Sequence, residues 1–486
     1  MYLVLIQSLG AEDKVGQAID VSLDVLEQLG VLIPRKVRRH TFKTELQKTK
    51  QLLEGMDIKS ILSFPIMDDE RITMVMSILD KVSMYALWAM PDLYPIVVFR
   101  MVRITIRHGL CASSAVAFAQ YAKLLCGMLS NPKLGLEFGN LALSMAEGWA
   151  ERAGGSLTGR ETTISQVLTT VHGFVHHWTN PIHQSFRPLF HGYRTGLQSG
   201  NLEAAALCIT CHCDFLMHTG QPLSLVDADC RVYERQMEEC GQELLRLMAA
   251  MLCNMTRNLM GQSVDPTLLN WEANNKDILQ MRGKKTRRCY ILDAMSMRRA
   301  CMSYYFGDYE TAWNLMKECG DVSKKMPADV MVWRMAFFEG LTALALAKKA
   351  WRWTPRRSYY LRQAKRAMKR IKLWINGKNM NCIHMNFLLE AELLSLGSKG
   401  VQEAVKNAYD KAISTSGRHG FPNDKALAYE RAGIYFVSIR DKFWADHYLG
   451  RALQGYLDWE AQGLADRLIK RFPHLSMSAI PLLEVI

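Results

Sequence analysis

The stretch Tyr304–Met316, YYFGDYETAWNLM, decides the fold class. Within it, Gly307, Tyr309 and Ala312 have the spacing of a turn that leads from one helix into the next. Glycine readily adopts the backbone conformations found just beyond a helix end, and a small alanine side chain lets two helices approach closely. The stretch therefore predicts a turn between two packed helices, and its recurrence along the chain would indicate a helical repeat.

Units of similar design recur toward the C-terminus. Residues 386–421 and 426–463 each contain a helix-like stretch, a short polar turn, a second helix-like stretch with small residues, and a closing glycine. Residues 294–320 have the same plan, and residues 338–374 form a looser copy with a longer, basic connection. A lone helix pair cannot bury its apolar face, so repeated pairs stack on one another.

Two of these units can be aligned position by position. At a shift of about 40 residues, Glu390 falls opposite Glu430, and Ala412 falls opposite Ala452. We expect five residues to form the turns and the packed interior of the repeats. They are Gly307, Tyr309, Ala312, Ala412 and Ala452.

Helical periodicity dominates the remainder of the chain. No run alternates as a strand would, and stripes of apolar residues recur at helical spacing. We therefore predict an all-α protein, a right-handed superhelix (α-solenoid) of stacked antiparallel helix pairs similar to tetratricopeptide repeats. The array would be continuous, with an N-terminal helical-repeat segment at 1–290 and a C-terminal tetratricopeptide-like segment at 291–486. An irregular helical bundle with chance similarities between its turns is the alternative.

Composition bounds the broad class of protein. The 486 residues are 49% hydrophobic, which is ample for a buried core and argues against disorder. No stretch of about 18 uncharged apolar residues occurs, and the start, MYLVLIQSLGAEDK, lacks the basic region of a secretory signal. The 12 cysteines are scattered, and without an export signal they predict reduced thiols and a cytoplasmic location.

The net charge of +13 is concentrated in the segments 34–50, 282–288 and 348–372. The last segment is predicted to contain a basic amphipathic helix with a possible interaction surface on one stripe. That stripe consists of Arg362, Lys365, Arg366, Lys369 and Arg370. The opposite, apolar stripe consists of Leu361, Ala364, Met368, Ile371 and Ile375.

Several interpretations of this basic segment stay open. Trp351, Trp353 and Trp374 flank it, and a basic amphipathic helix can bind anionic lipid, nucleic acid or calmodulin. The plainer interpretation is a solenoid helix whose apolar side is stacked and whose charges are solvated. Affinity for lipid or nucleic acid would fall steeply with salt, which separates those partners from a mostly apolar protein interface.

Catalytic signatures are missing from the sequence. The nearest approach to a phosphate-binding loop, Gly154–Thr162, has Arg and Glu where Lys and Ser or Thr are required. His172, His176 and His177 occur without the glycine-rich nucleotide boxes of a histidine kinase, and the protein-kinase signatures are also missing. We therefore predict a protein that is not an enzyme and has no cofactor.

One group of residues invites a metal-site hypothesis. Cys208, Cys211 and His212 would share a face of a helix at i, i+3 and i+4. A closed zinc site needs four ligands, and no second Cys-x-x-Cys pair is present. Small buried thiols in a helical core are the preferred interpretation, with a zinc site as the alternative.

A family resemblance rests on stretches spread over nearly the whole chain. They are VSLDVLEQLGVLIP (Val21–Pro34), PDLYPIVVFRMVRITIRHG (Pro91–Gly109), SSAVAFAQYAKLLCG (Ser113–Gly127), GLEFGNLALSMAE (Gly135–Glu147), VHGFVHHWTNPI (Val171–Ile182), FGDYETAW (Phe306–Trp313) and the two C-terminal repeats. Together they resemble the tetratricopeptide-like helical region of STAND-class signalling proteins. Those proteins carry a Ser/Thr kinase-like domain, a P-loop ATPase domain, this helical region and often GAF and histidine kinase domains.

The resemblance implies a non-catalytic scaffold for protein interaction and regulation. Its partner would be another protein, or the kinase and ATPase domains of its own signalling assembly, and these domains would lie outside this sequence. The chain opens inside what reads as a repeat and stops soon after Arg471–Leu475. A fragment of an ATP-dependent sensor kinase is therefore one alternative expectation, and an anionic lipid or nucleic-acid binder acting through residues 348–372 is another.

Overall fold

The computed structural model describes residues 2–12, 14–152, 157–268, 287–397 and 402–475. Helices and their connections make up these residues, which contain no strand. The one isolated β-bridge found in these ranges joins Ile66 to Leu110. The all-α prediction is confirmed for the part of the chain that is described.

The helices form two series, one before and one after residues 269–286, which are not described. In the element names, η denotes a 3₁₀ helix. The first series is α1 (Tyr2–Ala11), α2 (Val15–Gln28), α3 (Arg39–Leu53), η1 (Ile58–Ser63), α4 (Glu70–Ala89), α5 (Tyr94–His108), α6 (Ala112–Gly127), α7 (Pro132–Arg152), α8 (Leu157–Phe174), η2 (His176–Trp178), η3 (Ile182–Ser185), α9 (Phe186–Gln198), α10 (Leu202–His218), α11 (Leu223–Glu239) and α12 (Glu243–Leu259). The second is α15 (Arg287–Tyr305), α16 (Tyr309–Cys319), α17 (Val322–Lys325), α18 (Met331–Lys349), α19 (Pro355–Asn376), η4 (Met380–Cys382), α20 (Ile383–Leu394), α21 (Gln402–Arg418), α22 (Pro422–Ser438), α23 (Lys442–Asp458) and α24 (Gln462–Arg471). The predicted division at residue 290 falls inside α15 and stays a prediction.

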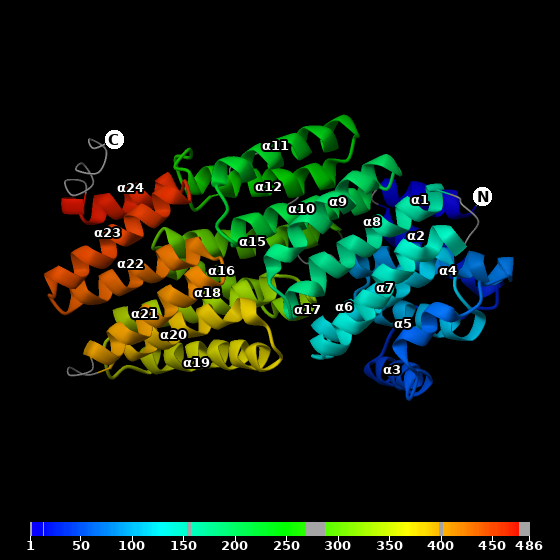
Figure 1. Ribbon diagram of the computed structural model, residues 1–486, viewed down its shortest axis with the longest axis horizontal. Coiled ribbons are helices and arrows are strands. Elements are labelled where there is room, and N and C mark those ends of the chain that lie inside the picture. The colour runs from blue at the N-terminus through cyan, green and yellow to red at the C-terminus, as the bar shows by residue number, and fades with distance from the viewer. Residues whose placement is uncertain (1, 13, 153–156, 269–286, 398–401, 476–486) are drawn as a thin grey trace.

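Consecutive helices lie side by side as antiparallel pairs (Figure 1). The pairs include α6 with α7, α11 with α12, α18 with α19 and α22 with α23. Each pair also contacts the next, as α21 contacts α22 and α16 contacts α18. The first and last described helices, α1 and α24, lie toward opposite ends of the long axis (Figure 1). This arrangement agrees with the predicted helical-repeat solenoid of stacked pairs.

The helix α4 is long and largely apolar. By length and composition it is the one helix among the described residues that could cross a membrane. It carries Asp80 and Lys81 near its middle, and it packs against α2, α5 and α6. In this structure α4 is therefore a core helix of the first series.

Residues 304–316 form the turn between α15 and α16, as predicted. Gly307 has a φ of +85°, in the left-handed region that favours glycine. Asp308 caps α16, because its side chain accepts a hydrogen bond from Thr311 N at 3.1 Å. The turn therefore ends one helix and starts the next with little strain.

The other residues predicted to pack within repeats lie inside the molecule. Ala312, Ala412 and Ala452 are each 0% exposed. Tyr309 packs against Tyr304 with ring centroids 5.3 Å apart and ring planes tilted by 44°, and it is partly buried. The alanines thus occupy positions where neighbouring helices leave no room for a larger side chain.

A buried glutamate ties the later repeats together. Glu392 accepts hydrogen bonds from Arg431 Nε and Nη2 at 3.0 and 2.9 Å, and from the Tyr409 hydroxyl at 2.7 Å. Burial raises the pKa of Glu392, but the nearby cations Arg431 and Lys348 outweigh burial and hold that pKa at about 2. Arg431 also donates to the Tyr309 hydroxyl at 3.1 Å, so one ion pair joins four helices.

The same arrangement recurs one repeat later, with a change of register from the sequence alignment. Glu430 accepts hydrogen bonds from the Tyr456 hydroxyl at 2.5 Å and from Arg467. Glu390, which the sequence aligned with Glu430, is instead a half-buried residue that pairs with Lys372 at 2.9 Å. The structural counterpart of Glu430 is Glu392, because only the inward side of α20 meets the next helix pair.

The two series of helices also contact each other directly. Asn381 Nδ2 donates to the carbonyl oxygens of His177 and Asn180 at 2.8 and 2.9 Å. Its Oδ1 accepts a hydrogen bond from Ile182 N at 3.1 Å. Repeats in a simple solenoid contact only their neighbours, so these contacts add a second layer of connections.

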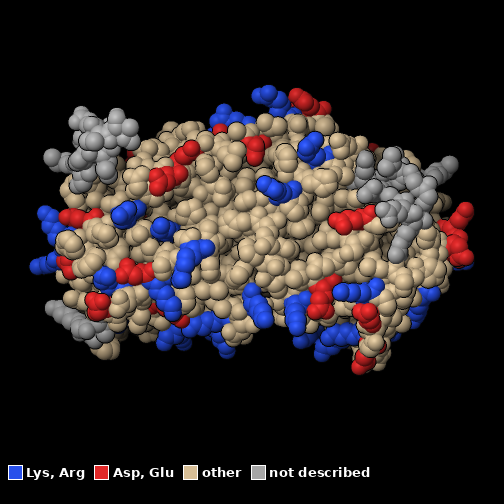
Figure 2. Space-filling view, viewed as in Figure 1, with Lys and Arg blue, Asp and Glu red and all other residues tan. Residues whose placement is uncertain are grey.

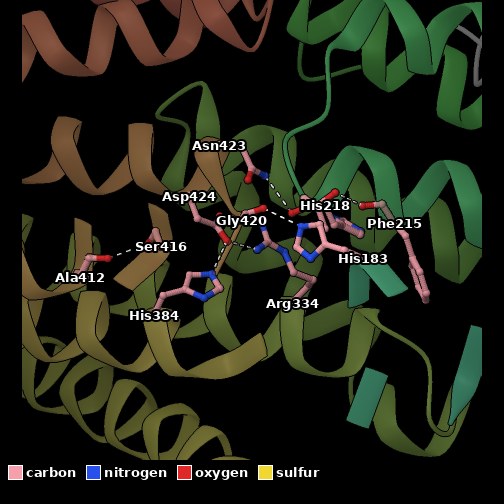
Figure 3. Close-up of polar contacts among 11 residues, drawn as sticks. His183, Phe215, His218, Arg334, His384, Ala412, Ser416, Gly420, Asn423 and Asp424 are labelled. Atoms are coloured by element: carbon pink, nitrogen blue, oxygen red, sulfur yellow. Dashed lines mark hydrogen bonds and ion pairs between the residues drawn. The ribbon is translucent and has the colours of Figure 1, made fainter. Parts of the chain in front are cut away.

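Further polar contacts connect the two series of helices (Figure 3). Asn423 Nδ2 donates to the His218 carbonyl oxygen at 3.1 Å, and His183 Nε2 lies 2.8 Å from the Gly420 carbonyl oxygen. They join α10 and η3 of the first series to α22 and the turn before it. The middle of the array is therefore closed by polar contacts rather than left open.

A buried ion pair between Arg334 and Asp424 lies beside these contacts. Arg334 Nη1 and Nη2 donate to the Asp424 carboxylate at 2.6 and 3.1 Å, and His384 Nε2 lies 2.8 Å from the same carboxylate (Figure 3). Burial raises the pKa of Asp424, but Arg334 and His384 outweigh burial and hold the pKa at about 2. The pair fixes α18, α20 and α22 relative to one another.

Candidate interaction surface

The helix α19 has a clear start and a clear buried side. Pro355 stands in its first turn, where its missing amide hydrogen is no loss, and Thr354 caps the helix by accepting a hydrogen bond from Arg357 N at 3.3 Å. The buried side faces α18. It consists of Tyr360, Ala364, Ala367, Met368 and Ile371. Leu361 and Ile375, predicted for the same stripe, lie half-buried at its edges.

The predicted basic helix over 348–372 needs one correction. Lys348 and Lys349 form the end of α18, and α19 begins only at Pro355. Proline cannot continue a helix that runs into it, and it also disfavours helical geometry in the residue before it. Residues 350–354 are therefore a connection between two helices, which the charge pattern alone did not reveal.

The outward side of α19 carries the predicted basic stripe. All five of its members are exposed. They are Arg362, Lys365, Arg366, Lys369 and Arg370. Figure 2 shows Lys and Arg side chains gathered along the lower edge of the molecule, where Figure 1 places α19.

Only part of this positive charge is neutralised locally. Arg370 pairs with Glu339, and Arg366 Nη1 donates to Gln363 Oε1 at 3.4 Å. Arg362, Lys365 and Lys369 have no ion-pair partner among the described residues. Three solvated cations on one rigid helix therefore remain available to an acidic partner.

Two tryptophans project beside the basic stripe. Trp351 and Trp353, in the connection before α19, are 80% and 86% exposed. The Arg352 guanidinium lies 5.8 Å from the centroid of the Trp353 ring. Large exposed aromatic residues next to cations are common anchors in binding surfaces, so the connection and α19 form one candidate surface. We call residues 351–353 together with the five basic residues of α19 the basic edge.

The other basic segments have different surroundings. Residues 34–50 lead into and form most of α3, which lies toward the opposite end of the same lower edge in Figure 1. Arg103 reaches α3 and bonds Thr49 Oγ1 at 2.8 Å, with Glu45 pairing the same guanidinium. Residues 282–286 of the third segment lie outside the described part of the chain.

The candidate zinc ligands on α10, Cys208, Cys211 and His212, lie in or at the edge of the packed interior. Cys208 Sγ lies 2.8 Å from Thr169 Oγ1, and His212 Nδ1 lies 3.1 Å from the Phe186 carbonyl oxygen. Burial raises the pKa of Cys208 to about 12, which disfavours the thiolate that a metal needs. In the described ranges, no group of three or more His, Cys, Asp and Glu residues is arranged to hold a metal ion.

The three histidines singled out in the sequence have their pKa values lowered by burial. His172 and His177 are buried, and burial lowers the pKa of each to about 3, so both stay neutral near pH 7. His176, in the same group, has its pKa lowered by burial as well. Of the candidate phosphate loop Gly154–Thr162, residues 154–156 lie outside the described residues, and residues 157–162 belong to the start of α8.

Sequence reasoning missed one residue that the structure singles out. Lys123 lies on α6 with only 4% of its surface exposed. The helix α6 is buried almost all round, so its one lysine had to be buried too. An apolar helix interrupted by a single lysine is the feature of the sequence that could have indicated it.

Comparisons with protein-family models, with curated proteins and with solved structures found no match for this chain. The resemblance to STAND-class signalling proteins therefore stays a prediction. The helical-repeat architecture rests on the structure itself.

Proposed function

We propose that this protein is a non-catalytic interaction scaffold whose basic edge docks an acidic surface of a protein partner. The observation that carries the proposal is the set of three exposed cations without ion-pair partners in the described residues, Arg362, Lys365 and Lys369, on a helix fixed by its buried side. A preformed helix loses little conformational entropy on binding, so its charges are used efficiently. Complementary charge also speeds the encounter with an acidic partner.

The nature of the partner follows from the resemblance and from the charge. A kinase or ATPase module of a signalling assembly is the partner that the resemblance implies, in the same polypeptide or in another. Acidic residues on such a module would face the basic edge, and Trp351 and Trp353 would supply apolar contact beside the ion pairs. The stacked repeats would hold this edge at a fixed distance from other bound modules.

The test uses the full chain as bait and a matched pair of variants. Arg362→Glu, Lys365→Glu and Lys369→Glu combined should abolish capture of a stoichiometric, salt-sensitive protein complex from cell extract. The control combines Lys36→Glu, Lys43→Glu and Lys50→Glu, which changes net charge equally at exposed positions around α3. Equal capture by both triple variants would contradict the proposal.

Anionic lipid is a second candidate because of the exposed tryptophans. Trp351 and Trp353 beside cations resemble the aromatic and basic residues of membrane-interface segments. Vesicles of phosphatidylcholine with phosphatidylserine provide the separate measurement. Sedimentation with these vesicles that is lost in Trp351→Ala/Trp353→Ala would favour lipid over protein as the partner, and absence of sedimentation would leave the protein partner favoured.

A further inference from the structure

A cavity lies in the first series of helices, far from the basic edge in sequence. It is bounded by α4, α6, α8 and α10 and has a volume of about 60 Å³. A single water needs only about 10–15 Å³ measured in this way, so the cavity has room for a small organic molecule. Its lining combines charged, amide and aromatic groups, among them Asp80, Lys123, Gln166, Trp88 and Phe174.

The cavity continues into a second, smaller one. Met84, Trp88 and Leu207 line both, and the second has a volume of about 30 Å³. From these shared residues it extends over Leu245 and Met248, so its walls are largely apolar. The combined space therefore has a polar end and an apolar end.

Lys123 supplies a cation at the polar end. Its Nζ lies 3.7 Å from the centroid of the Phe174 ring, and no carboxylate within the described ranges lies within ion-pair distance of it. Burial lowers the pKa of Lys123 to about 8, although the charge of Asp329 opposes this shift. At neutral pH the side chain is therefore mostly charged, and its ammonium group lies against the Phe174 ring.

Asp80 supplies a carboxylate on the same cavity. Burial raises the pKa of Asp80, while the charge of Lys81 and a hydrogen bond with Gln166 act in the opposite direction. In the part of the chain that is described, Asp80 takes part in no ion pair, either with Lys123 or with any other cation. Two opposite charges thus face one cavity without neutralising each other.

Amide groups around these charges are held in place. Gln120 Oε1 accepts a hydrogen bond from the Tyr94 hydroxyl at 2.6 Å, and its Nε2 donates to Thr170 Oγ1 at 3.5 Å. Gln120 and Thr170 also line the cavity. A fixed polar wall next to aromatic and aliphatic surfaces is typical of a site for a small molecule.

Lys123 is buried and Asp80 is half-buried, and neither has an ion-pair partner among the described residues, so each would gain from a bound counter-charge. An anion alone would satisfy Lys123 but leave Asp80 unpaired, and a cation alone would do the reverse. A molecule carrying both charges a few bonds apart satisfies both sides of the cavity. An apolar group on that molecule would then fit the continuation past Trp88 and Leu207.

We propose that this cavity binds a small zwitterion of the amino-acid class with an apolar side chain. Its carboxylate would lie against Lys123, its ammonium group against Asp80, and its side chain against Trp88 and Leu207. The site is separate from the basic edge, so the scaffold would bind a small molecule in addition to its protein partner. The tests below are therefore independent of the proposed function.

The first test compares ligands that differ only in charge. Isothermal calorimetry on the full chain would use L-leucine, 4-methylpentanoate, which lacks the amine, and isoamylamine, which lacks the carboxylate. We expect leucine to bind and both analogues to bind at least about tenfold more weakly, since each analogue leaves either Lys123 or Asp80 without a counter-charge. Equal affinity for the three, or no binding of leucine, valine and methionine at millimolar concentration, overturns the proposal.

The second test assigns the charges to residues. Lys123→Met and Asp80→Asn should each weaken leucine binding by about tenfold or more. Lys133→Met and Glu147→Gln, exposed positions on the neighbouring helix α7, are the matched controls and should bind as the natural chain does. Circular dichroism checks that each variant is folded, and a folded Lys123→Met variant with unchanged affinity contradicts the assignment.

Discussion

At the scale of single residues, the buried charge of Lys123 lowers the free energy of unfolding of the protein. Its pKa falls from 10.5 to about 8 because burial disfavours the ammonium form. The unfolded chain then binds the proton more tightly than the folded chain does, so the penalty is complete below pH 8 and disappears as the pH rises toward 10.5. A residue kept at such a cost is more easily understood as a ligand-binding group than as a packing group.

Lys123→Met should therefore stabilise the protein. We expect the free energy of unfolding at pH 7 to rise by about 1–3 kcal/mol, since one pKa unit corresponds to about 1.4 kcal/mol. The gain should shrink as the pH is raised above about 8. Urea unfolding measured at several pH values tests this, and Lys133→Met should leave the curve unchanged. A loss of stability in Lys123→Met would show that the ammonium group is already well paired.

At the scale of elements, the turn between α15 and α16 shows how a backbone conformation fixes a repeat. Gly307 has a φ of +85°, and a Cβ added there would meet no atom within 4 Å. Any cost of substituting it therefore comes from the backbone and not from a clash. Gly16, within α2, also has open space around an added Cβ but has an ordinary helical backbone.

These two glycines should respond in opposite directions to alanine. Gly307→Ala should lower the free energy of unfolding by about 1–2 kcal/mol, because the left-handed conformation is unfavourable for alanine. Gly16→Ala should raise it by about 0.4–1 kcal/mol, because alanine fits the helical backbone in the first turn of α2 and restricts the unfolded chain more than glycine does. Thermal and chemical unfolding of the two variants side by side would test the pair, and a neutral Gly307→Ala would show that the turn relaxes.

The same scale shows what the sequence could and could not predict. The turn at Gly307 and the exposed and buried sides of α19 follow from local periodicity, which a sequence displays directly. The exposure of Trp351 and Trp353 and the cavity beside Lys123 depend on which helices meet, and local patterns do not contain that information. The alignment of Glu390 with Glu430 failed for the same reason, since repeat similarity does not reveal which side of α20 faces inward.

At the scale of the whole molecule, the contacts between the two helix series are the least predictable feature. Asn381 bonds to the His177 carbonyl oxygen across 204 positions of sequence. A single asparagine in a short 3₁₀ helix gives no indication in the sequence of such a partner. Stacking of neighbouring repeats was therefore predictable from the sequence, whereas the closure of the array on itself was not.

Asn381→Ala tests this closure. The substitution removes three hydrogen bonds to the first helix series and leaves buried backbone groups of His177, Asn180 and Ile182 unpaired. We expect a loss of about 2–4 kcal/mol, and faster amide hydrogen exchange in both η2 and η4. Asn376→Ala, at an exposed position on α19, serves as the control. Faster exchange confined to η4 would contradict a coupling between the two series.

The polar seam at Asn423, His218, His183 and Gly420 has a mechanical consequence. An ordinary coil of repeats extends like a spring when its ends are pulled apart, because each turn yields separately. Here the two hydrogen bonds connect residues more than two hundred positions apart in the sequence. Tension applied at the termini would therefore act on both bonds at once, and the array would resist extension until both break. A module attached at either end would thus be held by a stiff array that extends little under force and then unfolds cooperatively.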